Sequence, residues 1–225
     1  MKKLLITLLV VCLLPVSRVQ ALDNDVTPNA KSAILIEANS RQILYDKNAE
    51  EKLYPASTTK IMTMILMFEA LRNKKISFDD EITTSKYAAS MGGSQVYLEV
   101  GESLSLKDMF KSIAIASAND ASVAVAEHIA GSINKFVEMM NDKAKKLGLK
   151  NTHFKNATGL HDPDHYTCAH DLAIMAAYLI EIGGEDLFAV TSLYVRYIRE
   201  VTKQSFWLVT TNILLKLYDC VDGLT

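Results

Sequence analysis

The stretch Tyr54–Lys60, which reads YPASTTK, runs without a break into an apolar segment from Ile61 to Leu71. This pattern predicts a helix that begins at Ser57 and presents Lys60 one turn later on the same face. A serine hydroxyl needs a neighbouring group to take its proton as it attacks, and a lysine can do this when burial lowers its pKa. The pair therefore indicates covalent catalysis. The simpler alternative is that Ser57 only caps a core helix.

The helix predicted over 61–71 is apolar on almost every side, which places it at the centre of the fold. Ahead of it, residues 32–36 and 42–45 have the composition of two strands joined by a turn over 38–41. A β-hairpin therefore leads into the Ser57 helix. Further helices are predicted over 104–116, 121–130, 132–147 and 169–182, with Gly183–Gly184 ending the last, and aromatic and β-branched residues alternate over 193–198.

The composition, 49% hydrophobic and 22% charged over 225 residues, fits one globular domain with a sizeable core. At the N-terminus, two lysines precede the apolar run Leu4–Leu14, and Val19–Ala21 supplies the small residues that a signal peptidase reads. We therefore predict a cleaved signal peptide over 1–21 and a mature domain over 22–225, with an uncleaved anchor as the alternative. Loss of 1–21 takes the formal charge from −2 to −5, and an acidic surface argues against nucleic acid as a partner.

A second polar stretch, Ala116–Asp120 (ASAND), separates two of the predicted helices. A small polar break between apolar helices lets side chains point into a cleft, although Ser, Asn and Asp are also ordinary turn residues. The spacings S-x-x-K and S-x-N recur at Ser132 with Lys135 and Asn134. Because Ser132 follows Gly131 at the head of an amphipathic helix, we expect it to be an N-cap and not a nucleophile.

The segment His161–Asp171 is rich in metal-ligand residue types, but its spacings match no zinc pattern, so we expect no metal. A polar loop followed by the first turn of a helix accounts better for it. The chain has no glycine-rich phosphate loop, no H-E-x-x-H and no G-x-S-x-G motif, and we expect no cofactor. Cys168 and Cys220 remain in the mature chain and are expected as free thiols.

Taken in order, these motifs resemble those of the serine D-alanyl-D-alanine carboxypeptidases, the low-molecular-weight penicillin-binding proteins with a serine β-lactamase-like fold. The resemblance extends from about residue 31 to residue 224, which is nearly the whole mature chain. The segments that carry it are Ser57–Lys60, Gly93–Gln95, Ser117–Ser122, Asn156–Leu160, Tyr218–Asp219 and Val221–Leu224.

The resemblance implies an α+β fold, with a five-stranded antiparallel sheet flanked by helices and an all-helical portion that contributes the Ser117 loop. It implies that Ser57 attacks the carbonyl between two D-alanines of a peptidoglycan stem peptide, and that Lys60 takes the serine proton. Ser117 is implied as a proton relay toward the leaving group, and Asn119 as the residue that holds the substrate amide. β-Lactams would be covalent inhibitors, and the protein would act outside the cytoplasm, in the cell envelope.

Members of this family carry a Lys-Thr-Gly motif after a segment like Val221–Leu224, whereas here Thr225 follows and the sequence ends. We therefore expect a fold that is incomplete at the C-terminus and lacks the strand supplying half of the oxyanion hole. Membrane association is expected only in a full-length form.

Two alternatives stay open for the function. The first is a truncated, inactive relative that only binds peptidoglycan. The second is a class A β-lactamase, which shares the S-x-x-K pair. It is less favoured because the chain has Ser117-Ala118-Asn119 in place of S-D-N, and only Asp162 and Asp164 in the loop where such enzymes carry a deacylating Glu.

Overall fold

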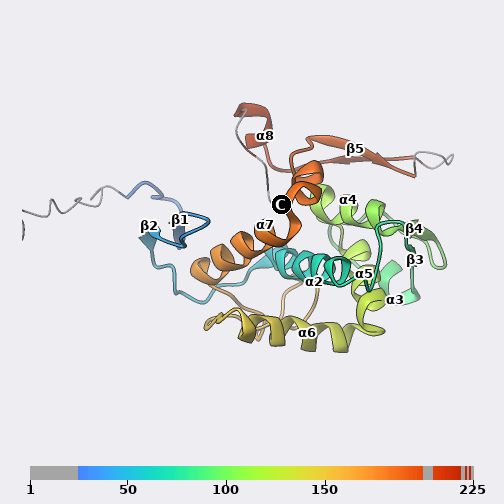
Figure 1. Cartoon of the computed structure of the whole chain (residues 1–225), viewed down its shortest axis with the longest axis horizontal. Coiled ribbons are helices and arrows are strands. Elements are labelled where there is room, and N and C mark those ends of the chain that lie inside the picture. The colour runs from blue at the N-terminus through green and yellow to red at the C-terminus, as the bar shows by residue number, and fades with distance from the viewer. Residues whose placement is uncertain (1–24, 200–204, 219–220, 222, 224–225) are drawn as a thin grey trace, which may run out of the picture. The chain divides into compact units, whose positions relative to one another are not determined.

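The computed structural model describes residues 25–199, 205–218, 221 and 223 (Figure 1). The predicted signal peptide over 1–21 lies outside the described residues, as do Asp222 and Leu224. The chain divides into two units, Met1–Ala30 and Lys31–Thr225, and the helices and strands of the described residues lie in the second. No helix in the described part of the chain combines the length and the apolar character needed to cross a membrane.

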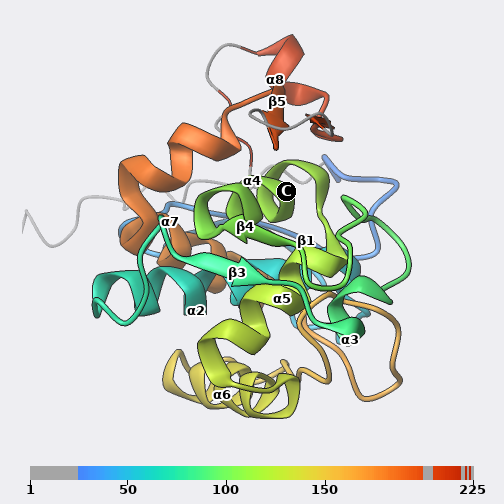
Figure 2. The same ribbon diagram turned by 90° about the vertical axis from the view of Figure 1, so that its right-hand side faces the viewer.

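Helix α2 (Lys60–Arg72) lies at the centre of the fold, as its apolar sequence predicts. Every residue from Lys60 to Phe68 is buried. Three helices pack around it, as Figures 1 and 2 show: α5 (Asn119–Ala130), α6 (Ile133–Lys146) and α7 (Ala169–Thr191). This packing fixes the first turn of α2, where Lys60 lies, relative to the rest of the core.

The strands form three separate antiparallel pairs. The first pair confirms the predicted hairpin, with a register shift between Leu35 and Ile36. The pairs are β1 (Ala33–Ile36) with β2 (Ile43–Lys47), β3 (Glu81–Thr83) with β4 (Ser103–Ser105), and β5 (Val195–Ile198) with β6 (Phe206–Val209).

The five-stranded sheet implied by the family resemblance is not formed by the described residues. The β1–β2 pair packs against α7, whereas the β5–β6 pair packs against α4 (Leu106–Ala116). The β3–β4 pair lies beside α4 and α5 (Figure 2). Because each pair lies on a different part of the helical core, no strand of one pair bonds to a strand of another within this part of the chain. The α+β class is confirmed, with short strand pairs around a helical core.

Helices α4 and α5 each begin two residues away from their predicted starts. Helix α4 starts at Leu106 and not at Leu104, because β4 occupies Ser103–Ser105 and the Ser105 hydroxyl caps the helix by accepting from the Asp108 N–H at 3.2 Å. Helix α5 starts at Asn119 and not at Ala121. Asn119 therefore lies in the first turn of a helix and is not part of a free loop.

Helix α7 does not end at Gly183–Gly184 as predicted but continues to Thr191. Gly184 adopts φ +49° and ψ −137°, a conformation that is rare for residues with a Cβ, so the helix kinks there and resumes. The extension buries Leu187 and Val190. The remaining short helices are η1 (Ala56–Thr59), α3 (Lys86–Ala89) and α8 (Leu214–Leu217).

Candidate active site

The side chains of Ser57 and Lys60 meet where η1 joins α2. Ser57 lies inside the 3-10 turn of η1, and its Oγ is 3.2 Å from Nζ of Lys60, the first residue of α2. Neither helix has a side-chain cap at its N-terminus. The alternative that Ser57 only caps a core helix is therefore wrong, and the serine oxygen is bonded to the amine that the spacing predicts.

Lys60 is fully buried, and its Nζ donates to the backbone carbonyl of Thr158 at 2.9 Å. Burial disfavours the charged amine and lowers its pKa from 10.5 to about 8, while the Asp120 carboxylate acts in the opposite direction. At pH 7 about one Lys60 side chain in ten is then neutral, against about one in three thousand for an unperturbed lysine. The site thus holds an amine that can accept a proton near neutral pH.

The turn over Asn156–Leu160 presents the Thr158 carbonyl to Lys60. The Asn156 Oδ1 accepts from the Thr158 N–H at 3.1 Å and from the Gly159 N–H at 2.7 Å, and its Nδ2 donates to the Leu160 carbonyl. The turn packs closely against the residue before Ser57, because a Cβ on Gly159 would lie 1.7 Å from the Ala56 carbonyl oxygen. The sequence identified this stretch only as a family motif and gave no sign of its role as a support for Lys60.

Ser117 and Asn119 lie at the junction of α4 and α5. Ser117 ends α4 in the left-handed conformation, with φ +55°, and its buried hydroxyl oxygen has no hydrogen-bond partner within the described part of the protein. Asn119 donates from Nδ2 to the Gly92 carbonyl at 2.7 Å, whereas its Oδ1 is buried without a partner there. An unpaired buried polar group costs about 1–3 kcal/mol, so a hydrogen bond from a bound molecule to either atom would be favourable.

Gly93 lies between the Ser57–Lys60 pair and the Ser117–Asn119 pair. A Cβ on Gly93 would lie 2.8 Å from Asn119 Nδ2 and 4.0 Å from Leu160, which belongs to the turn that supports Lys60. The charge of Asp120, next to Asn119 in the sequence, also acts on Lys60. The structure thus brings Ser57, Lys60 and Asn119 into one region, with Ser117 two residues from Asn119.

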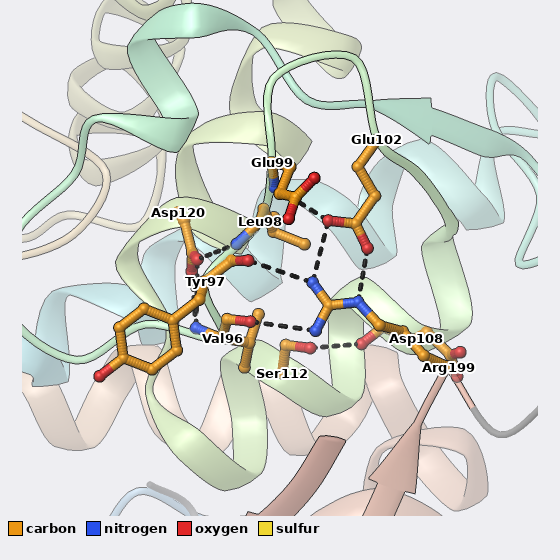
Figure 3. Close-up of polar contacts among 9 residues, drawn as sticks. All are labelled: Val96, Tyr97, Leu98, Glu99, Glu102, Asp108, Ser112, Asp120 and Arg199. Carbon is orange, nitrogen blue, oxygen red and sulfur yellow. Dashed lines mark hydrogen bonds and ion pairs between the residues drawn. The ribbon is translucent and has the colours of Figure 1, made fainter. Parts of the chain in front are cut away.

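Asp120 is a residue of this region that the sequence reasoning missed. Its carboxylate is fully buried and accepts from the backbone N–H groups of Val96 and Leu98, each at 3.1 Å (Figure 3). It also accepts from the Ala121 N–H at 2.9 Å. Three backbone donors replace the water that a carboxylate loses on burial. The sequence signal that could have identified Asp120 is its place in the first turn of a helix, where the helix dipole favours negative charge.

Thr59 at the end of η1 and Thr63 in α2 bond to the segment that contains Thr158. Thr63 Oγ1 donates to the Ala157 carbonyl at 2.8 Å, and Thr59 Oγ1 lies 2.8 Å from Nε2 of the buried His165. The His165 Nδ1 accepts from the Lys155 N–H, so the proton of the neutral ring is on Nε2 and points to Thr59. Burial lowers the pKa of His165 from 6.5 to about 4, so the ring is neutral at physiological pH.

The competing motif at Ser132 is structural, as predicted. The Ser132 hydroxyl caps α6 by accepting from the Lys135 N–H, and the Lys135 side chain is exposed. Across the described residues, no cluster of three His, Cys, Asp or Glu side chains is arranged to hold a metal ion. Cys168 is a buried free thiol that caps α7, and Cys220 lies outside the described residues.

Residues 18–225 match the D-alanyl-D-alanine carboxypeptidase family. The chain is 54% identical over 200 residues to D-alanyl-D-alanine carboxypeptidase DacF of Bacillus subtilis, an alignment that covers 89% of this chain and 51% of DacF. The chain therefore spans about half the length of this curated relative.

Solved structures with the same fold include two penicillin-binding proteins. Penicillin-binding protein 5 from Haemophilus influenzae superimposes with a TM-score of 0.81 at 33% identity, covering 87% of this chain and 56% of that protein. Penicillin-binding protein D2 from Listeria monocytogenes, in its ampicillin-bound form, superimposes with a TM-score of 0.77 at 26% identity, covering 90% and 80%.

Proposed function

Because the chain belongs to the D-alanyl-D-alanine carboxypeptidase family, we propose that the protein removes the terminal D-alanine from peptidoglycan stem peptides through an acyl-enzyme on Ser57. The observation that carries this proposal is the hydrogen bond between Ser57 Oγ and a fully buried lysine amine whose pKa is lowered to about 8. A serine next to a buried, partly neutral lysine is a nucleophile with its own base.

In the acylation step, neutral Lys60 takes the proton of Ser57 as Oγ attacks the carbonyl carbon between the two D-alanines. The Thr158 carbonyl accepts from Lys60 Nζ at 2.9 Å and holds the amine 3.2 Å from Ser57 Oγ, within reach of the serine proton. The Oγ–carbon bond forms and the carbon–nitrogen bond to the terminal D-alanine breaks. Ser117, whose hydroxyl is unpaired within the described residues, passes the proton to the leaving nitrogen.

Asn119 holds the substrate amide in this proposal. Because Nδ2 is committed to the Gly92 carbonyl, the atom offered to a ligand is the acceptor Oδ1. The group it recognises is therefore an N–H of the peptide backbone. In a site that excludes water, such a bond contributes to orientation as well as to binding.

Water then hydrolyses the ester on Ser57, with Lys60 again taking a proton, and the shortened peptide leaves. A β-lactam amide enters the same route and leaves slowly, because its ring opens without releasing a fragment from the site. The ampicillin-bound form of the Listeria monocytogenes relative supports this reading of the family fold.

The N-terminal segment and the location of the substrate both bear on where the protein acts. Residues 1–21 are proposed as a cleaved signal peptide and residues 22–225 as catalytic domain. The substrate lies in the cell envelope, so the protein acts outside the cytoplasm.

The test is release of D-alanine from a synthetic peptide ending in D-Ala-D-Ala by the product of the complete gene. Wild type should release it, and Ser57→Ala should not, while Ser132→Ala should match wild type. Binding of peptidoglycan without release would identify an inactive binding relative instead. Rapid turnover of the chromogenic cephalosporin nitrocefin would identify a β-lactamase.

A further inference from the structure

The orientation of Asn119 depends on a loop with no regular secondary structure, Gly92–Leu98. The Asn119 side chain donates to the Gly92 carbonyl at 2.7 Å, and its backbone N–H donates to the Ser94 carbonyl at 2.7 Å. Neither bond lies within α5 itself. A shift of this loop therefore turns or frees the amide that is offered to the substrate.

The loop is held from two sides, as Figure 3 shows. On one side, the Asp120 carboxylate accepts from the N–H groups of Val96 and Leu98. On the other, Arg199 donates from Nη1 to the Val96 carbonyl at 3.1 Å and from Nη2 to the Tyr97 carbonyl at 3.3 Å. Tyr97 has φ +56°, a left-handed conformation that costs about 1–2 kcal/mol in a non-glycine residue. These backbone bonds hold it in that conformation.

Arg199 is in turn fixed by Glu102. Its Nε donates to Glu102 Oε1 and its Nη2 to Oε2 at 2.9 Å, the two-pronged arrangement that a planar guanidinium allows. The Arg199 side chain is 7% exposed and that of Glu102 18%. Burial raises the pKa of Glu102, but its bonds with Arg199 and the Glu99 N–H outweigh this and leave the pKa below its usual value. The carboxylate therefore stays charged at neutral pH.

We propose that Arg199 and Glu102 are positioning residues for the reaction: together they fix the Gly92–Leu98 loop, and through it the Asn119 side chain that binds the substrate amide. This proposal rests on the proposed function and deepens it. Arg199 follows β5, so it links the β5–β6 pair to the Asn119 side of the site. Four donor contacts from one side chain explain why an arginine and not a lysine suits this place.

The experiment measures the rate constant for acylation by a fluorescent penicillin in the product of the complete gene. Arg199→Ala should lower this rate constant by about 10- to 100-fold, the order that a small misplacement of a binding group costs. Arg199→Lys should not restore it, because one ammonium group cannot bond both carbonyls and both carboxylate oxygens. Arg196→Ala is the matched control, since Arg196 lies exposed on β5, the strand that Arg199 follows, and its loss should leave the rate unchanged.

A double variant separates positioning from general damage to the fold. If Arg199 acts through Asn119, Arg199→Ala should lower the rate by less than about twofold in an Asn119→Ala background. Equal losses in both backgrounds would overturn the proposal. Should Arg199→Ala fail to fold, Glu102→Gln gives the same test, because it keeps the side-chain size and removes the charge that holds Arg199.

Hydrogen exchange gives a readout that does not depend on activity. The amide protons of Val96, Leu98 and Asn119 should exchange faster in Arg199→Ala, while those in the middle of α2 should not change. Unchanged exchange at the amides of Val96, Leu98 and Asn119 would overturn the proposal. If wild type forms no acyl-enzyme at all, the proposed function fails, whereas faster exchange in the loop would still show that Arg199 holds it.

Discussion

Lys60 shows how a single buried residue sets the chemistry of this site. Its burial removes the water that stabilises an ammonium group, and the Thr158 carbonyl is the neutral acceptor that replaces part of it. The negative charge of Asp120 limits the fall in pKa. The balance leaves an amine that is mostly charged at rest, yet neutral often enough to act as a base.

The acylation rate should therefore depend on pH through Lys60. Below pH 8 the neutral fraction rises about tenfold per pH unit, so the rate constant for labelling by a fluorescent penicillin should rise with pH and level off above about 8. In Lys60→Ala the rate should fall by orders of magnitude and lose this inflection. A flat profile for wild type between pH 6 and 9 would exclude Lys60 as the base.

His165 predicts a second pH effect, on stability. Its pKa is about 4 in the folded protein against 6.5 for the free residue, so between these values the unfolded chain binds a proton that the folded one does not. The free energy of unfolding should thus fall as the pH drops from about 6.5 to about 4. His165→Gln should show a smaller fall in melting temperature over this range, whereas the exposed His161→Gln should follow wild type. Equal slopes in all three proteins would contradict the assignment.

At the scale of elements, the contact between the Asn156–Leu160 turn and η1 holds the nucleophile in place. Gly159 has φ +88°, and any Cβ there would overlap the Ala56 carbonyl, so Gly159→Ala must displace either the turn or Ser57. Penicillin labelling should fall at least tenfold, because the reacting atoms move.

The control for this variant is Gly148→Ala. Gly148 also has a positive φ, +73°, but open space surrounds the position of its Cβ, so the change should cost only about 1–2 kcal/mol of stability. We expect penicillin to label Gly148→Ala at the wild-type rate and Gly159→Ala at least tenfold more slowly. Equal labelling by both variants would show that the close contact is not needed.

Elements defined by local pattern could be predicted from the sequence, and those set by distant contacts could not. The hairpin, α2 and α6 follow from periodicity over a few residues. The sequence predicts that the helix ends at Gly183–Gly184, because only the tertiary burial of Leu187 and Val190 shows that it resumes after the kink.

The candidate site divides in the same way. Ser57 and Lys60 lie three residues apart, so helix geometry alone brings them together. The Thr158 carbonyl is 98 residues from Lys60, and Arg199 is 97 residues from Glu102. No local pattern encodes such contacts, because they exist only once the core has packed.

At the scale of the whole molecule, stability depends on the packing around α2. Met64 is fully buried in the main core cluster, so Met64→Ala should lower the free energy of unfolding by about 2–5 kcal/mol through lost burial and the cavity left behind. Met139, which is 37% exposed, is the control, and its replacement by alanine should cost less than about 0.5 kcal/mol. Urea unfolding measures both, and equal costs would show that α2 is not the centre of the core.

The most direct test of the central claim is to locate the covalent adduct. The product of the complete gene is incubated with benzylpenicillin, digested, and its peptides are identified by mass spectrometry. The proposed function predicts one penicilloyl group, on Ser57, with none in Ser57→Ala and an unchanged amount in Ser132→Ala. An adduct on any other residue, or labelling that survives in Ser57→Ala, would contradict the assignment of Ser57 as the nucleophile.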